Sequence, residues 1–202
     1  MKEIILQKAT EMFLRLGFKS VTMDDIAAEL GISKKTIYLH FANKNELVNA
    51  SAMHLFETIS AGIDKIHEAG KNPIEEIFEV RNFIMQHLND EKVSPFYQLQ
   101  KFFPEVYQTL RGLQFGKMNG SMKENLRKGI ETGIYQQDID IEFVSRIYFT
   151  GLTGIKDTEI FPQSLFNAQQ LTKKYLEYHL KAIATPKGLD ILKTELKKLT
   201  NI

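Results

Sequence analysis

Apolar residues recur every three to four positions along almost the whole chain, and no convincing run alternates polar and apolar residues. The first stripe, formed by Ile5, Ala9, Met12 and Leu16, is typical of a helix with one buried face. A strand would instead place its apolar residues at every second position. The pattern therefore predicts an all-α fold.

Composition narrows the class of protein further. The 202 residues, 43% hydrophobic and 25% charged, are typical of a folded globular protein with one large core or two smaller ones. Cysteine is absent, which excludes disulfides and thiol chemistry and makes the cytoplasm the expected compartment. No uncharged stretch approaches the roughly 18 residues of a membrane-spanning helix, so no membrane contact is expected. The net charge of +1 gives no global argument for nucleic-acid binding.

A local argument comes from the N-terminal quarter, where three helix starts fall within fewer than thirty residues. The candidate N-caps are Thr22, with Asp25 three residues later, Ser33, and Asn43, with Glu46 three residues later. Gly31 separates the first two of these helices and can take the positive φ angle of a sharp turn. Apolar residues are spaced so that both short helices pack against each other and against the first helix. This arrangement predicts a helix-turn-helix.

The second short helix has a polar face that is expected to point outward. That face consists of Ser33, Lys34, Lys35, Thr36, Tyr38, Leu39 and His40. Lysines in the first turn oppose the helix dipole, so helix stability does not explain Lys34 and Lys35, whereas an anionic partner does. Between Ser33 and Lys44 there are three lysines and no acidic residue. Lysine can reach base edges and phosphates in the major groove, so DNA binding is one interpretation and a solvated structural face is the other.

The segment FLRLGFKSVTMDDIAAELGISKKTIYLHFANKNEL resembles the N-terminal domain of TetR-family bacterial repressors. The matching residues are Phe13, Gly17, Thr22, Ile26, Ala27, Gly31, Ile32, Ser33, Thr36, Ile37, Tyr38, Phe41, Lys44 and Leu47. A weaker resemblance continues in LRKGIETGIYQQDIDIEFVSRIYF. The resemblance implies a homodimer that binds double-stranded DNA at a palindromic operator, with an all-helical C-terminal domain that binds an inducer.

The expected DNA-binding residues are Thr22, Ser33, Lys34, Lys35, Thr36, Tyr38, His40 and Lys44. The resemblance implies phosphate contacts for four of them, Thr36, Tyr38, His40 and Lys44. It implies that Lys34 and Lys35 turn toward the bases. Lys35 stands where a small residue, often glycine, is frequent, so its bulk can move it onto a phosphate instead.

The domain organisation predicted from these patterns is a helix-turn-helix domain over residues 1–46 and a helical dimerisation and ligand-binding domain over residues 47–202. A long helix at 44–69 joins them. The other helices expected in the second domain cover residues 73–88, a short stretch from 95, 104–132, 141–156, 167–184 and a last stretch after 186. Four glycines at 112, 116, 120 and 129 indicate a bend or a close helix contact in the 104–132 helix.

Aromatic residues and methionines crowd the middle of the chain. Most are expected to be core residues, but a subset can line an apolar effector pocket between helices. The candidate ligand-binding residues are Phe83, Phe96, Tyr97, Phe102, Phe103, Tyr107, Phe115 and Met118.

The 167–184 helix carries two apolar stripes, which indicate two packing partners. One stripe is Leu171, Tyr175, Tyr178 and Ala182, and the other is Leu176, Leu180 and Ile183. One of the two can face a second subunit, with an intrachain core as the alternative. The predicted dimer interface consists of Tyr148, Gly151, Ile155, Tyr175, Leu176 and Leu180.

No motif for catalysis, metal binding or a cofactor is present. The five histidines have no metal-site spacing, and GxSxG, Gly-rich phosphate loops and GxGxxG are absent. We therefore predict no enzyme, metal or cofactor. The predicted function is a repressor that a small-molecule effector releases from a palindromic operator. The alternative is a constitutive helical DNA-binding or scaffolding protein with no effector.

Overall fold

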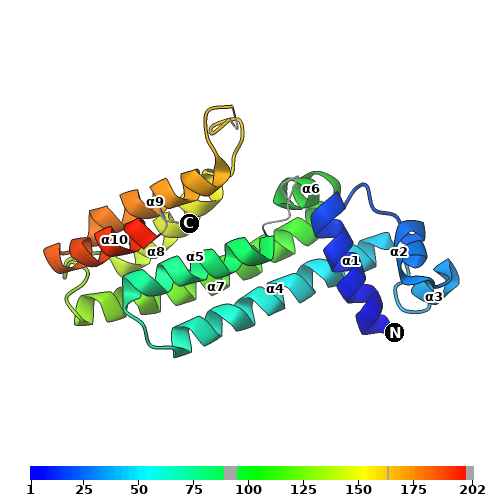
Figure 1. Ribbon diagram of the computed structural model, residues 1–202, viewed down its shortest axis with the longest axis horizontal. Helices are drawn as coiled ribbons and strands as arrows, with labels where there is room; N and C mark the ends of the chain where they lie inside the picture. The colour runs from blue at the N-terminus through cyan, green and yellow to red at the C-terminus, as the bar shows by residue number, and fades with distance from the viewer. Residues whose placement is uncertain (89–94, 163, 199–202) are drawn as a thin grey trace. The chain divides into compact units, whose positions relative to one another are not determined.

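A computed structural model gives the structure of residues 1–88, 95–162 and 164–198, which form ten helices. Apart from one antiparallel bridge between Tyr135 and Ala184, these residues contain no β-structure, so the all-α prediction is confirmed. The helices are α1 (Lys2–Leu16), α2 (Met23–Leu30), α3 (Lys34–Tyr38), α4 (Lys44–Glu68), α5 (Pro73–Leu88), α6 (Pro95–Phe102), α7 (Pro104–Glu131), α8 (Ile141–Gly154), α9 (Ala168–Ile183) and α10 (Pro186–Lys198) (Figure 1).

The helices pack into two compact units, each with its own apolar core. The first unit consists of Met1–Lys65 and Asn82–Gln114, and the second of Ile66–Arg81 and Phe115–Ile202. Helices α4, α5 and α7 contribute residues to both units. This division by packing differs from a functional boundary at residue 46, which stays a prediction.

The first unit contains the predicted helix-turn-helix. Ile5 and Phe13 from α1, Ile26 from α2 and Ile37 from α3 are at most 1% exposed and belong to one cluster. Leu99 of α6 lies in the same cluster. The short helices therefore bury their apolar faces as the sequence predicts, and α6 is part of the same core.

Two glycines shape this unit. Gly31 ends α2 with φ +63 and ψ 31, the left-handed conformation that the sharp turn into α3 requires. Gly17 ends α1 with φ +93 and ψ 145, a positive-φ conformation outside the left-handed helical region. Both positions are strained for any residue with a side chain.

The four glycines predicted to mark a bend or a close contact in α7 differ in their surroundings. An added Cβ would meet nothing within 4 Å at Gly112, Gly116 or Gly120, whereas at Gly129 it would collide with the ring of Tyr135. A close contact therefore forms only at Gly129 among these four, and α7 runs as one helix through all of them.

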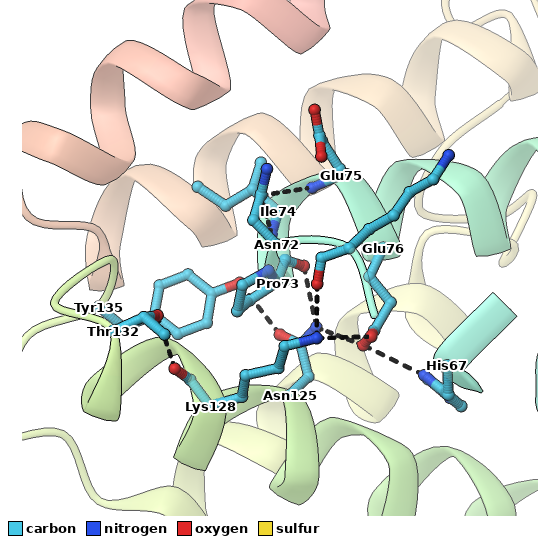
Figure 2. Close-up of polar contacts among 11 residues, drawn as sticks. His67, Asn72, Pro73, Ile74, Glu75, Glu76, Asn125, Lys128, Thr132 and Tyr135 are labelled. Carbon is cyan, nitrogen blue, oxygen red and sulfur yellow. Dashed lines mark hydrogen bonds and ion pairs between the residues drawn. The ribbon is translucent and has the colours of Figure 1, made fainter. Parts of the chain in front are cut away.

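The second unit encloses a buried polar cluster next to its apolar core (Figure 2). Glu76 of α5 is 4% exposed, and its Oε1 lies 3.1 Å from Nδ1 of His67 and accepts a hydrogen bond of 2.7 Å from Nδ2 of Asn125. Nζ of Lys128 lies 3.8 Å from Oε2. Burial alone would raise the pKa of Glu76, but hydrogen bonds from His67 and Asn125 and the nearby positive charges outweigh it and lower that pKa.

Asn125 is the centre of this cluster. Its Nδ2 also donates to the carbonyl oxygen of Pro73 at 2.9 Å, and its Oδ1 accepts from the hydroxyl of Tyr135 at 3.0 Å. Tyr135 is fully buried. The cluster therefore joins the end of α4, the start of α5, α7 and the turn after α7 (Figure 2).

Candidate nucleic-acid interface

Side-chain caps set the starts of α2 and α3. Oγ1 of Thr22 accepts from the N–H of Asp25 at 3.2 Å, and Oδ2 of Asp25 accepts from the N–H of Thr22 at 2.8 Å, so the predicted capping box is confirmed. The N–H and the hydroxyl of Thr22 both donate to the carboxylate of Asp25, and these hydrogen bonds lower its pKa. Oγ of Ser33 accepts from the N–H of Thr36 at 3.1 Å. Thr22 and Ser33, both predicted to bind DNA, thus first orient the helices that carry the other candidates.

The outward face of α3 agrees with the sequence interpretation. Ile37 is fully buried, whereas Tyr38 is 44% exposed and Leu39, at the end of the helix, is 74% exposed. Lys34 and Lys35 are exposed in the first turn. Thr36 and His40 also lie on the part of this segment that the structure leaves accessible. The described surface of α3 therefore combines cations, hydroxyls and one large apolar side chain.

The two lysines of α3 differ in their electrostatic surroundings. Nζ of Lys34 forms an ion pair of 2.8 Å with Oδ2 of Asp24 on α2, and this hydrogen bond raises the pKa of Lys34. Lys35 forms no ion pair within the part of the chain that the structure describes. Asp24 lies ten positions before Lys34, so no helical spacing in the sequence links the two residues. Lys35 is the lysine whose charge is left for an external anion.

Lys44 lies at the start of α4 and is partly buried. Its Nζ donates to the carbonyl oxygen of Lys19 at 2.9 Å and lies 5.9 Å from the centre of the Phe103 ring. Burial lowers the pKa of Lys44, and the charge of Asp25 opposes this effect. An ammonium has three N–H donors, so one can hold Lys19 while another contacts a phosphate.

Residues 5–51, which cover α1 to α3 and the start of α4, match a family model described as bacterial regulatory proteins of the tetR family. This N-terminal segment is therefore similar to the tetR family of bacterial regulatory proteins. The protein is a DNA-binding transcriptional regulator.

Similar proteins match over more of the chain than this segment. The HTH-type transcriptional repressor KstR2 of Mycobacterium tuberculosis is 27% identical over 178 residues, which cover 85% of this chain and 87% of KstR2. The negative regulator of the biofilm operon icaADBC, IcaR of Staphylococcus aureus, is 23% identical over 128 residues, 63% of this chain and 68% of IcaR.

Solved structures have the same fold. A transcriptional regulator from Cytophaga hutchinsonii matches with a TM-score of 0.73 and 18% identity over 91% of this chain and 98% of its own. The structure of KstR2, described as a ketosteroid transcriptional regulator, matches with a TM-score of 0.58 and 23% identity over 91% and 95% of the two chains.

The predicted effector residues fall into different packing units. The side chain of Phe96 lies outside the described residues. In the first unit, Tyr97 and Phe102 of α6 are 55% and 36% exposed. Phe103 and Tyr107 pack against the core of that unit, and Phe83 lies against Gly62. In the second unit, the ring of Phe115 lies 5.1 Å from that of Phe149, and Met118 packs against the core. Their role in ligand binding stays a prediction.

An open groove of about 390 Å³ lies between α9 and α10 in the second unit. Its floor is apolar and its rim is charged, and it contains none of the predicted effector residues. The lining residues are Glu177, Lys181, Leu189, Leu192, Lys193 and Leu196.

Three of the predicted dimer residues are buried within the single chain. Leu176 and Leu180 are at most 1% exposed and Tyr148 is 8% exposed, because the chain's own second core covers them. These three side chains pack in the chain's own core, and their place in a dimer interface stays a prediction. Gly151 and Ile155 remain partly accessible.

The other stripe of α9 leads to an exposed apolar face. Tyr178 is 76% exposed, and on α8 Phe143 and Ile147 are 60% and 43% exposed. Helices α8 and α9 lie side by side, and the hydroxyl of Tyr175 donates to the carbonyl oxygen of Ile147 at 3.0 Å (Figure 1). The ring of Tyr175 occupies the space where a side chain at Gly151 would stand. The apolar periodicity of the sequence placed Tyr178 in one stripe of this helix, whereas Phe143 and Ile147 of α8 were not predicted.

His179 is a buried titratable group in the same pair of helices. It is 5% exposed, its ring lies 5.2 Å from that of Tyr148 and 5.8 Å from that of Tyr175, and its Nε2 has no hydrogen-bond partner among the described residues. Burial lowers the pKa of His179 to about 4. The folded protein therefore holds this imidazole neutral.

We expect the free energy of unfolding to fall by about 2 kcal/mol between pH 7 and pH 5 because of His179. The unfolded chain takes up a proton near pH 6.5, whereas folded His179 resists protonation until about pH 4. Stability is therefore lost as the pH falls through this window. In urea unfolding, a His179→Leu variant should not show this fall in the free energy of unfolding between pH 7 and pH 5. The surface variant His87→Leu should show the same fall as the wild type. An unchanged pH dependence in His179→Leu would contradict the assignment of this fall to His179.

Two other kinds of site are absent from the part of the chain that the structure describes. No helix in residues 1–88, 95–162 or 164–198 is long and apolar enough to cross a membrane. Over the same ranges, no three His, Cys, Asp or Glu residues come together in a way that could hold a metal ion.

Proposed function

We propose that the protein represses transcription by binding a palindromic operator as a homodimer, with one α3 helix on each half-site. The observation that carries this proposal is the exposed face of α3, with Lys35 outside any described ion pair, within the segment that matches the family model. The descriptions of KstR2 as a repressor and IcaR as a negative regulator support repression. Such a regulator acts on the chromosome, so the bacterial cytoplasm is its expected location.

The proposed contacts follow from the surroundings of each side chain. Lys35 binds a phosphate or a base edge, and Tyr38 donates its hydroxyl to a phosphate. Leu39 presents the largest apolar surface of this segment and can contact the methyl group of thymine. The remaining proposed DNA contacts are Thr22, Ser33, Lys34, Thr36, His40 and Lys44.

A Lys35→Ala variant should bind its operator about tenfold more weakly, and the slope of log affinity against log salt should fall by about 0.9 for each phosphate that the protein no longer neutralises. Lys34→Ala is the matched control and should have a smaller effect, because Asp24 already compensates that charge. The probe is a duplex selected from a random library by the wild-type protein, and the measurement is fluorescence anisotropy. Equal affinity of Lys35→Ala and wild type at moderate salt would contradict the assignment.

Dimerisation through α8 and α9 is the second part of the proposal. Half-sites lie about one helical turn, roughly 34 to 36 Å, apart, so a chain with one helix-turn-helix needs a second copy. The apolar face with Phe143, Ile147 and Tyr178 supports a symmetric interface in which the same surface of two copies meets. Tyr175, Gly151 and Ile155 would lie beside this face.

An apolar small molecule is the effector class we propose. The description of KstR2 as a ketosteroid regulator supports this class, because a ketosteroid is a largely apolar small molecule. The effector must bind two conformations with different affinity to change operator binding. A compound that raises the melting temperature and also changes operator affinity would support an effector. Ligands that change only the melting temperature would favour the constitutive binder.

A further inference from the structure

The turn between α1 and α2 is held by a side chain from a distant helix. Gln98 of α6 is 7% exposed, and its Oε1 accepts a hydrogen bond of 3.1 Å from the backbone N–H of Lys19. The two residues are 79 positions apart in the sequence. A buried amide that bonds to a loop backbone is a specific contact, because an unpaired N–H at that place would be costly.

Gly17 provides the space for this contact. A Cβ at Gly17 would lie 2.7 Å from Oε1 of Gln98 and would also collide with its Nε2. The φ angle of +93 disfavours any side chain at this position for a second, independent reason. Gly17 and Gln98 therefore fit each other, and α6 can lie this close only because α1 ends in glycine.

Lys19 receives contacts from both sides. Its N–H is bound by Gln98, and its carbonyl oxygen accepts from Nζ of Lys44 at 2.9 Å. Its own Nζ lies 4.5 Å from the centre of the Phe102 ring at the end of α6. Both backbone polar groups of Lys19 are thus occupied by side chains of α6 and α4.

The neighbouring aromatic residues strengthen the same contact. The ring of Phe18 stacks on that of Phe13 at 5.1 Å and meets the edge of Phe103 at 6.5 Å. Phe18 is 3% exposed. Three residues after Lys19, Thr22 caps the start of α2. The turn that α6 fixes therefore leads directly into the helix-turn-helix.

We propose that Gln98 is a positioning residue for operator binding, which acts by holding the turn at Gly17 and Lys19. It fixes the start of α2 and the position of Lys44, both of which belong to the proposed DNA interface. This inference rests on the proposed function. Gln98 itself touches no DNA, and any movement of α6 away from the turn breaks its hydrogen bond and leaves the N–H of Lys19 unpaired.

Two substitutions separate the hydrogen bond from the volume of the side chain. Gln98→Met keeps a similar length and removes the acceptor, whereas Gln98→Glu keeps an oxygen acceptor for the N–H of Lys19. Gln100→Met, on the exposed side of α6, is the matched control. We expect hydrogen exchange at the amide of Lys19 to accelerate in Gln98→Met and to stay near the wild-type rate in the other two variants.

Operator affinity supplies the functional readout, with a duplex selected from a random library by the wild-type protein. Loss of one hydrogen bond predicts about 3- to 10-fold weaker binding for Gln98→Met. Gln98→Glu and Gln100→Met should stay within about twofold of the wild type. Because all measurements are made well below the melting temperature, a general loss of stability would not produce this selective difference.

Three results would overturn the inference. If Gln98→Met exchanges faster at Lys19 but binds the duplex as tightly as the wild type, the turn does not control DNA binding and the proposed function stands. If exchange at Lys19 is unchanged, Gln98 does not hold the turn. If the wild-type protein selects no duplex, the proposed function fails first, and the positioning role fails with it.

Discussion

An Ile147→Glu, Tyr178→Glu double variant should be monomeric at micromolar concentration and should bind its operator at least about 100-fold more weakly than the wild type. Both side chains are exposed in the single chain, at 43% and 76%, so the charges should leave its fold intact. In a symmetric interface each substitution occurs twice and places unpaired carboxylates in an apolar contact. A monomer loses the second half-site and with it the gain from bivalent binding.

Light scattering would measure the mass of this variant, and fluorescence anisotropy would measure its affinity for the selected duplex. Leu113→Glu is the matched control, because Leu113 of α7 is 41% exposed and lies outside the proposed interface. A glutamate at Leu176 would be uninformative, since that residue is in the core. A double variant that remains dimeric would show that the interface lies elsewhere.

The helix boundaries could be predicted because their signals are local. The capping pair Thr22 and Asp25 lies within three residues, and Ser33 caps the helix that it begins. Pro73 begins α5 because the first turn of a helix needs no N–H from its first residue. Each signal acts on the backbone next to it, so packing elsewhere in the chain cannot alter it much.

The surroundings of the DNA-binding candidates could not be predicted in this way. Asp24 neutralises Lys34 across two helices, and Gln98 reaches Lys19 from 79 positions away. Neither pair follows a helical spacing. The sequence therefore makes Lys34 and Lys35 look equivalent, whereas packing leaves only Lys35 without a described ion pair.

The two stripes of α9 show a different limit. The periodicity correctly indicated two apolar faces, but a period does not say which face meets the chain's own core. The structure encloses Leu176 and Leu180 and leaves Tyr178 exposed. Choosing between the faces requires the positions of α8 and the rest of the second core, which are properties of the whole fold.

The buried polar cluster gave no signal in the sequence, since Glu76 and Asn125 have the residue types of a solvated helix surface. Their burial makes them sensitive to substitution. An Asn125→Leu variant should lose about 3 to 5 kcal/mol of the free energy of unfolding. It removes a donor from the carboxylate of Glu76, a donor from the carbonyl of Pro73 and the acceptor of the Tyr135 hydroxyl. Leucine has the same branching and the same number of side-chain heavy atoms, so it leaves no cavity and the lost hydrogen bonds dominate the effect.

Urea unfolding followed by circular dichroism would measure this loss, with two further variants as a graded series. Tyr135→Phe leaves only Oδ1 of Asn125 without its partner and should cost about 1 kcal/mol of the free energy of unfolding.

Glu76→Gln removes the charge of this buried carboxylate and tests the pH dependence of stability. Because folding lowers the pKa of Glu76, the charged form stabilises the fold above its ordinary pKa of 4.5, and this contribution is lost as the pH falls through the folded value. Wild type and Glu76→Gln should therefore differ at pH 7 and converge at low pH. A loss of less than about 1 kcal/mol in Asn125→Leu would mean that water or a rearranged side chain replaces the bonds of the amide.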